Sequence, residues 1–247
     1  MISVHDKPRD KRRNPGAPRL LAVFSFRYDA HLVPAMLENI EPLVDGWVSY
    51  DDRTSSAVFS DEPARRVALL EAARAAGADW VLAIDPDERF ETLLGFFVDQ
   101  LMAVDGAVAY SFMLREMYDA QRYRIDGVWA SKRQTRLFRL PEQLAPAAAP
   151  LHSPWHSMIP GVRVVDTTLN LYHLKMIAPA RRQLRADLYR LLDPENRLQP
   201  IGYDYLADEN GAKFESIPAG RGYQPPHVED GGSWMPDTTE PLPAEPD

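Results

Sequence analysis

Cysteine is absent from this 247-residue chain. Its absence excludes disulfide bonds, thiol catalysis and thiolate metal sites together. A chain of this length buries most of its apolar surface on folding, so it needs no covalent or metal staple to be stable. The sequence also lacks any run of the roughly 20 apolar residues that cross a bilayer, and residues 1–19 lack the apolar stretch of a secretory signal. We therefore expect a cytoplasmic protein without a transmembrane segment.

Glycine-rich phosphate-binding loops are missing as well. No GxGxxG, GxxxxGKS or GxxxxGKT pattern stands between an expected strand and the helix after it, so the usual dinucleotide and P-loop sites lose their main support. Acidic residues outnumber basic ones, 36 against 28, so the formal net charge is -8 and we do not expect nucleic acid as the main partner. A basic cluster at residues 7–13 allows peripheral contact with phosphate or a membrane surface, although such a segment is more often a solvated tail.

The two ends of the chain differ in composition from the middle. Residues 1–18 are polar, basic and interrupted by three prolines, which predicts a disordered N-terminal arm. Residues 223–247 are rich in proline, acid and glycine, which predicts a disordered tail. The intervening residues 19–222 have the length of one large domain.

Apolar runs of strand length alternate with helix-like segments in the first half of this domain. Strands are expected at residues 20–26, 46–50 and 79–84, and helices at 31–43, 63–76 and 92–102. The strand at 79–84 is apolar after its first residue, which is typical of a strand covered on both faces. Further strands are expected at 107–114, 135–140 and 169–174, with a basic amphipathic helix at 178–192. The alternation predicts an α/β fold with a mostly parallel central sheet flanked by helices.

Carboxylates gather where the third expected strand ends, in Asp85-Pro86-Asp87-Glu88. Residues two apart in extended backbone project to the same side, so Asp85 and Asp87 can face one ion. Hard oxygen ligands of this kind suit Mg²⁺ or Mn²⁺ together with phosphate oxygens, and open α/β sheets bind ligands at this end of their strands. The alternative is a solvated acidic turn or a helix N-cap.

A second acidic turn, Asp51-Asp52-Arg53-Thr54, follows the strand at 46–50. If the two strands are neighbours and parallel, their acids share one edge of the sheet. A carboxylate there can accept hydrogen bonds from a nucleobase or a ribose hydroxyl. An Asx-type turn formed by Asp with Thr and Ser is the alternative.

The order and spacing of these pieces over residues 19–100 resemble family 2 glycosyltransferases with the GT-A fold. In that family a strand and a helix precede a strand ending in an acidic D-D-x-S-T-like turn, then a helix and a strand ending in D-x-D. The segments here read AVFSFRYDAHLVPAMLENI, GWVSYDDRTSS and EPARRVALLEAARAAGADWVLAIDPDERF. A looser similarity extends to about residue 180, through Trp129, the KRQTRLFR run at 132–139 and NLYHLKM around His173.

The resemblance implies a GT-A-type, Rossmann-like domain with a nucleotide-binding half at 19–105 and a smaller acceptor-side half, including the C-terminal helix, at 106–222. It implies inverting transfer of a sugar from a nucleoside diphosphate sugar to a glycan, lipid-linked or small-molecule acceptor. It also implies a Mn²⁺ or Mg²⁺ ion held by Asp85, Asp87 and His173. The side chains implied to bind the nucleotide sugar are Ser25, Arg27, Asp51, Asp52, Asp85, Lys132 and Arg136, with Arg133 and Asp29 as further neighbours of the phosphates or the nucleotide.

The match fails at the general base that an inverting transfer requires. Relatives with the RLFR run often carry a His-Glu pair soon after it, whereas His152 and His156 are both followed by Ser. The remaining candidates for the base are Glu116, Asp119, Asp126 and His156. For each of them, a surface loop charge or a structural histidine is the alternative.

Two other functions share these features. A Mg²⁺-dependent phosphohydrolase would use the same acids, but an aspartyl phosphatase normally has Thr where this chain has Arg89. A non-catalytic nucleotide-sugar or glycan-binding module would explain the missing His-Glu pair. Tyr118, Trp129 and Trp155 could stack on sugar rings in either a transferase or a binding module, although core packing is the commoner role of Trp.

Overall fold

The structure is a computed structural model that describes residues 1–14, 16–54, 61–146, 154–197 and 199–227. It is a mixed α/β fold, as expected. The described strands and α-helices are, in chain order, β1 (Ile2–Asp6), β2 (Leu20–Phe26), α1 (Val33–Ile40), β3 (Gly46–Asp51), α2 (Glu62–Ala75), β4 (Trp80–Ala83), β5 (Glu88–Phe90), α3 (Leu94–Met102), β6 (Val108–Glu116), β7 (Arg122–Arg124), β8 (Arg133–Arg139), β9 (Arg163–His173), α4 (Pro179–Leu192) and β10 (Phe214–Ser216).

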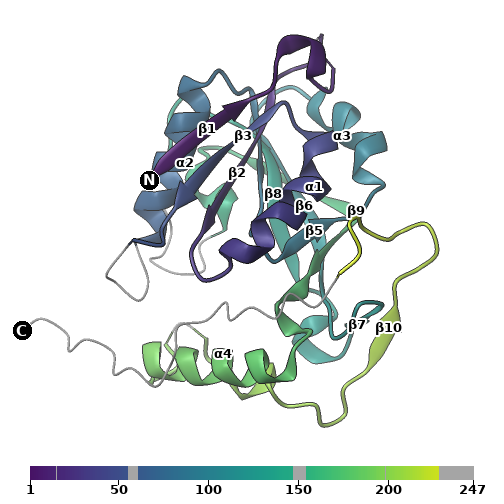
Figure 1. Ribbon diagram of the computed structural model, residues 1–247. Helices are drawn as coiled ribbons and strands as arrows, with labels where there is room; N and C mark the ends of the chain where they lie inside the picture. The colour runs from purple at the N-terminus through teal and green to yellow at the C-terminus, as the bar shows by residue number, and fades with distance from the viewer. Residues whose placement is uncertain (15, 55–60, 147–153, 198, 228–247) are drawn as a thin grey trace, which may run out of the picture.

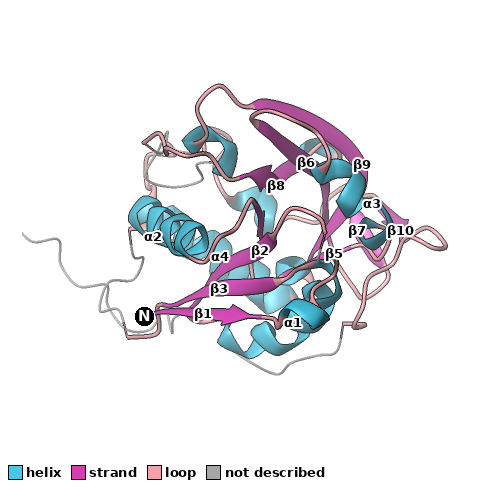
Figure 2. Ribbon diagram, turned by 90° about the horizontal axis from the view of Figure 1, so that it is seen from above, coloured by secondary structure: helices cyan, strands magenta, loops and turns pink. Residues whose placement is uncertain are grey.

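One eight-stranded sheet has the order β1-β3-β2-β4-β8-β6-β9-β5. β3, β2 and β4 are parallel, and so are β6 and β9. β1 against β3, β8 against both β4 and β6, and β5 against β9 are antiparallel. The predicted sheet flanked by helices is confirmed, and the sheet is mixed: β3, β2, β4, β6 and β9 run in one direction, whereas β8, between β4 and β6, and the edge strands β1 and β5 run in the other. Seen from above, the sheet curls from β1 round to β9 (Figure 2).

The sheet lies between two apolar clusters that follow the alternation of side chains along β2 and β4. One face carries Leu20, Ala22, Trp80 and Leu82, packed with residues of α1 and α3. The other face carries Leu21, Val23, Val81 and Ala83, packed with residues of α2. Because both faces are covered, these strands are apolar at consecutive positions, and this is why the sequence marked them clearly.

β1 corrects the prediction for the N-terminal segment. It pairs along β3 in continuous antiparallel register, with Val4 opposite Val48. Further along, Arg13 forms an ion pair with Asp99 of α3. The prediction that residues 1–18 are a disordered arm is therefore wrong at β1. The edge of β3 offers backbone hydrogen bonds to a partner strand, and composition alone does not reveal this.

The beginning of the predicted C-terminal tail also packs on the domain. Tyr223 is buried, with its ring centroid 5.1 Å from that of Tyr172. Asn39 Nδ2 of α1 donates to the carbonyl oxygen of Gln224 at 2.7 Å. The prediction of a disordered tail from residue 223 is wrong at these positions, and residues 228–247 lie outside the described residues.

A smaller part of the chain lies at one end of the main sheet (Figure 1). It contains α4 and a two-stranded sheet of β7 and β10. A separate apolar cluster in this part includes Tyr118, Trp129 and Tyr203, so Tyr118 and Trp129 have a packing role, as does Trp155 against Phe138 in the main domain. Among the described residues, no helix is long and apolar enough to cross a membrane.

Candidate functional site

The acidic turn begins where β4 ends. Ile84 N donates to Val23 O of β2 at 3.1 Å, and residues 85–87 follow at once. Because β3, β2 and β4 run parallel, their carboxyl ends meet at one edge of the sheet, and Asp51 at the end of β3 lies along the same edge. The sequence suggested that the two strands with acidic ends are neighbours. In the structure β2 lies between β3 and β4, so these strands are not adjacent. α4 lies below this edge (Figure 1).

Arg136 of β8 is the buried partner of the turn. Its Nη2 donates to Asp85 Oδ2 at 2.6 Å and to Glu88 Oε1 at 2.5 Å. The Arg136 and Glu88 side chains are 4% and 1% exposed, whereas that of Asp85 is 51% exposed. Burial raises the pKa of Glu88 against the opposing effect of Arg136, while for Asp85 burial is outweighed by Arg136 and the pKa is lowered. Arg136, predicted to bind the nucleotide sugar, is thus held by two carboxylates of the turn.

Arg89 supports the turn through main-chain contacts. Its Nη1 donates to Pro86 O at 2.7 Å and to Glu88 O at 2.6 Å. The side chain is 2% exposed, and burial lowers its pKa to about 10. Sequence reasoning used Arg89 only to argue against a phosphatase. No spacing signal marks an arginine that binds carbonyl oxygens, so its structural role was missed.

Asp87 and His173 are brought together by pairing of β5 with β9. Glu88 lies opposite His173 in that register, and Leu174 N donates to Asp87 O at 2.8 Å. His173 Nε2 consequently lies 3.2 Å from Asp87 Oδ2, and both side chains are less than 10% exposed. Burial opposes charge on both side chains. The positive charge of His173 outweighs burial at Asp87 and lowers the pKa of that carboxylate. Burial and Lys175 oppose the charge on His173, but Glu116 and Asp87 together raise its pKa to about 9.

The spacing of Asp87 and His173 fits two ligands of one octahedral ion. Ligands at about 2.1 Å from such an ion and at right angles to one another are about 3.0 Å apart, close to the 3.2 Å between Oδ2 and Nε2. Among the described residues, no group of three or more His, Cys, Asp or Glu side chains is arranged to hold a metal ion. Asp85, the predicted third ligand, is engaged by Arg136. The described part of the chain thus offers two ligands here, and Mg²⁺ in nucleotide enzymes is often held by one or two carboxylates plus substrate phosphates.

Asp29 adds a further carboxylate beyond the end of β2. Its Oδ1 accepts from Arg27 N at 2.9 Å. Burial, followed by repulsion from Asp87 and a smaller contribution from Asp85, raises its pKa to about 7. Burial is the larger cause of this shift, and the smaller contributions of Asp87 and Asp85 come from negative charge nearby, which a cation would relieve. Ser25, predicted to bind the nucleotide sugar, lies opposite Tyr50 where β2 and β3 end.

The acids at the end of β3 have intramolecular partners. Asp51 accepts from Arg53 Nε at 2.9 Å and from Arg53 Nη2 at 2.7 Å, and these hydrogen bonds lower its pKa to about 2. Asp52 is 7% exposed and lies 3.5 Å from Arg65 Nη1 of α2. Asp51 therefore remains partly open at the sheet edge, whereas Asp52 faces the helix.

Basic side chains border Asp87 on the side of α4, and two of them contact the buried carboxylate of Glu116. Glu116, at the end of β6, is fully buried, and its Oε1 lies 3.5 Å from Nζ of both Lys132 and Lys175. Burial lowers the pKa of each lysine against the attraction of Glu116. Lys175 and Arg185 of α4 also lower the pKa of Asp87, although less than His173 does. Lys132 was predicted from the sequence; Lys175 and Arg185 were not.

Three of the four candidates for a general base, Asp126, His156 and Asp119, are engaged away from the acidic turn. Asp126 accepts from Arg124 Nε at 2.8 Å and from Nη2 at 2.9 Å, and this pairing lowers its pKa. His156 Nδ1 lies 2.8 Å from Thr135 Oγ1, and burial lowers its pKa. Asp119 is bound to Arg122 at 2.6 Å. The structure does not bring Asp126, Asp119 or His156 into contact with the acidic turn, and His152 lies outside the described residues.

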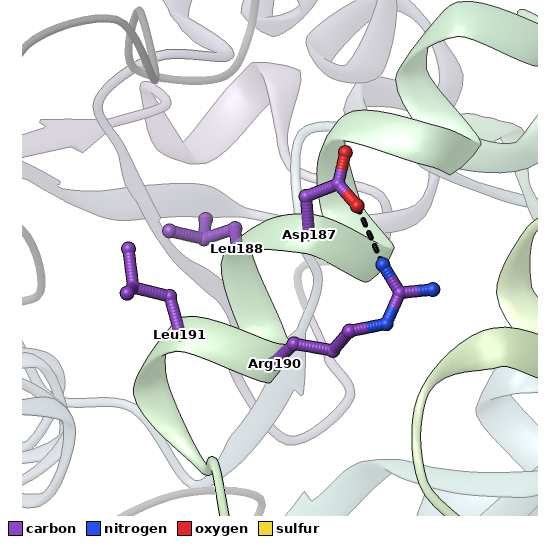
Figure 3. Close-up of a pocket in the computed structure, with 4 residues that line it drawn as sticks. All are labelled: Asp187, Leu188, Arg190 and Leu191. Atoms are coloured by element: carbon purple, nitrogen blue, oxygen red, sulfur yellow. Dashed lines mark hydrogen bonds and ion pairs between the residues drawn. The ribbon is translucent and has the colours of Figure 1, made fainter.

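Two hollows in the described surface lie away from the acidic turn. One of about 470 Å³ lies along α4 and is lined by Asp187, Leu188, Arg190 and Leu191 (Figure 3). Asp187 Oδ1 and Arg190 Nη1 pair there at 2.5 Å. The other, of about 400 Å³, lies between α1 and α3 and is lined in part by Phe90 and Phe96. Neither contains a residue predicted for catalysis, so we place the candidate site at the turn.

Comparison of the sequence with protein-family models and with curated proteins finds no match. Function must therefore be argued from the site. At one sheet edge the chain assembles acids that suit a divalent cation and, beside them, cations that suit an anion. A ligand that carries both charges, such as a metal-bound diphosphate, complements that arrangement.

Proposed function

We propose that this protein is a glycosyltransferase that moves a sugar from a nucleoside diphosphate sugar to an acceptor hydroxyl with the help of Mn²⁺ or Mg²⁺. The observation that carries the proposal is the approach of Asp87 Oδ2 to His173 Nε2, at the sheet edge where three parallel strands end. In open α/β sheets ligands bind at this edge. The same residues stand at the D-x-D and later histidine positions by which the sequence resembles family 2 glycosyltransferases with the GT-A fold.

The leaving diphosphate gains negative charge as the sugar departs. When bound, a divalent ion supplies Lewis-acid stabilisation of that charge. Asp87 and His173 would hold the ion, and Lys132, Lys175 and Arg185 add positive charge beside them. Because these side chains are packed in position before substrate arrives, they can stabilise developing charge with little rearrangement.

The nucleoside would lie along the carboxyl ends of β2 and β3. Ser25, Arg27 and Asp51 are the predicted contacts there, and Asp51 Oδ atoms accept hydrogen bonds already from Arg53. A base or ribose would share this carboxylate with Arg53. We assign Asp52 to a different task, holding α2 against the strand end through Arg65, because its side chain is buried.

A nucleotide-sugar-binding module without catalysis is the second candidate. It is favoured by one observation: Asp126, Asp119 and His156 have partners away from the turn, and Glu116 is fully buried among cations. An inverting transfer needs a base that reaches the acceptor hydroxyl. Only a test of turnover separates the two candidates.

A thermal-shift screen of nucleoside diphosphates with and without Mn²⁺ tests the proposal. Stabilisation that requires both components supports a metal-dependent nucleotide-sugar site. Stabilisation by metal with a phosphomonoester, but not with a nucleoside diphosphate, contradicts it and supports a phosphohydrolase. A nucleotide-release assay over a panel of donors and acceptors then decides between transferase and binding module, since only the transferase releases nucleotide.

A further inference from the structure

Glu116 is the one predicted base that contacts the site, and its surroundings are unsuited to taking a proton from an acceptor. The side chain is 0% exposed. Its Oε1 is 3.5 Å from two lysine ammonium groups, and its Oε2 is 3.1 Å from His173 Nδ1. A carboxylate with three cationic or polar neighbours and no access to solvent is suited to a structural or positioning role, and an acceptor hydroxyl cannot reach it.

The contact with His173 shows what that use is. His173 presents Nε2 to Asp87 and Nδ1 to Glu116, so one imidazole ring lies between two carboxylates. His173 Nδ1 and Glu116 Oε2 lie 3.1 Å apart, but in the described structure neither makes a hydrogen bond, with each other or with any other described residue. Both atoms are buried, and a buried polar atom without a partner is costly, so the two are available to each other alone.

We infer that Glu116 is a positioning residue: it accepts the Nδ1–H of His173 and thereby presents Nε2, with its lone pair, to a divalent ion shared with Asp87. Metal-binding histidines commonly donate their other ring nitrogen to a carboxylate, which fixes the tautomer and the orientation of the ring. This inference rests on the proposed metal-dependent function and adds to it a residue outside the ligand set.

Lys132 and Lys175 explain how the chain keeps Glu116 ionised for this purpose. A buried carboxylate without counter-charges would tend to become neutral. The two ammonium groups lie on its Oε1 side, leaving Oε2 to face the ring. Lys132 is fixed in turn by Trp129, whose ring centroid is 4.0 Å from Nζ.

Mn²⁺ affinity, measured from the free-ion signal in electron paramagnetic resonance with and without inorganic pyrophosphate, tests the inference. Glu116→Gln should weaken Mn²⁺ binding by roughly 10- to 100-fold, as loss of an outer-shell partner does. In a His173→Ala background the same change should have no further effect, because the ring through which Glu116 acts is gone. Glu91→Gln is the matched control: Glu91 is equally buried but pairs with Arg221, and its loss should leave Mn²⁺ affinity unchanged.

The outcomes separate the inference from the function beneath it. A wild-type protein that binds no Mn²⁺, with or without pyrophosphate, contradicts both. If His173→Ala weakens binding and Glu116→Gln does not, only the role of Glu116 is overturned. Equal losses from Glu116→Gln in the wild-type and His173→Ala backgrounds would also overturn it, since they indicate a general effect on the fold.

Removal of Glu116 leaves two lysines without their counter-charge, and the single variant could fail to fold. The pair Glu116→Gln and Lys175→Met, compared with Lys175→Met alone, removes one positive charge together with the carboxylate. Relative to Lys175→Met, the double variant should lose Mn²⁺ affinity by the same factor as Glu116→Gln does relative to the wild type. Equal affinities of the double variant and Lys175→Met would overturn the inference. Nitrogen-15 NMR of the His173 ring with Mg²⁺ gives an independent readout: Nδ1 should carry the proton in the wild type, and a ring protonated at Nε2 would contradict the proposed geometry.

Discussion

Arg136 Nη2 binds Asp85 Oδ2 and Glu88 Oε1 at once, at 2.6 and 2.5 Å. Both Asp85 and Arg136 were expected to bind the nucleotide sugar, and in the described structure they bind each other. Asp85 nevertheless keeps half of its exposure, so it can receive a ligand on its outer side while Arg136 anchors it. The buried pair of Arg136 and Glu88 is then a support for the turn.

Loss of Arg136 should therefore lower the free energy of unfolding, because Arg136 is the buried ion-pair partner of the turn. Arg136→Met leaves Glu88 buried and unpaired, and breaking a buried pair on one side costs about 3–5 kcal/mol. Adding Glu88→Gln should recover a large part of that loss, because it removes the isolated charge. Chemical denaturation of the two variants measures both effects. Equal stabilities for Arg136→Met and the double variant would show that the pair does not support the turn.

Asp87→Asn should abolish Mn²⁺-dependent stabilisation by a nucleoside diphosphate while the fold remains intact. The change removes a ligand, so the affinity should fall by at least roughly 10-fold, the loss seen even for outer-shell partners. Isothermal titration with nucleotide and Mn²⁺ measures it. Asp166→Asn is the matched control, because Asp166 is an exposed carboxylate on β9 that pairs with Arg133. Unchanged affinity in Asp87→Asn would remove this residue from the site.

Parts of the fold with strong local signals were predictable from the sequence. β2, β3 and β4 are apolar runs of strand length, and α2 has Pro63 near its start and Gly77 just after its end. β1, β5 and β7 have no such signal. They are short or exposed, and the neighbouring strand that supplies their hydrogen bonds decides their conformation.

The candidate site also contains residues that the sequence predicted and residues that it did not. The acids of the turn were predictable because they directly follow a buried strand. The partners of those acids were only partly predictable: Arg136 is 51 positions from Asp85 in the sequence, and only the order of the strands brings them together. Lys175 and Arg185 carried no motif, and Glu116 was assigned a role that its burial does not suit.

The pairing of β1 with β3 predicts unequal effects of proline at adjacent positions. Met1 and Asp51 exchange both backbone hydrogen bonds, so by the alternation of antiparallel ladders Ser3 is hydrogen-bonded to Ser49 and Val4 is not bonded to Val48. Ser3→Pro should destabilise by about 1 kcal/mol or more through the lost bond, whereas Val4→Pro should cost less. Amide exchange at Ser49 should accelerate only in Ser3→Pro, and equal protection in both variants would mean that β1 does not pair this way in solution.

The metal-free protein should lose stability as the pH rises from 6.5 toward 9, and His173 should account for it. Glu116 and Asp87 raise the pKa of His173 from 6.5 to about 9, against the effects of burial and Lys175. A group whose folded pKa exceeds its unfolded value stabilises fully below the unfolded pKa, and this stabilisation is lost as the pH rises through the folded pKa. The difference between the unfolded and folded pKa of His173 corresponds to about 3 kcal/mol of folding free energy.

Denaturation at a series of pH values with a chelator present measures that loss. His173→Gln should flatten the profile between pH 6.5 and 9, whereas His156→Gln should not, because burial lowers the pKa of His156 and its contribution changes below 6.5. Mn²⁺ should act in the opposite sense. The ion binds the neutral ring, so its stabilising effect should grow over the same range in which the metal-free protein weakens. A wild-type profile that matches His173→Gln would show that the ring carries no stabilising charge between Asp87 and Glu116.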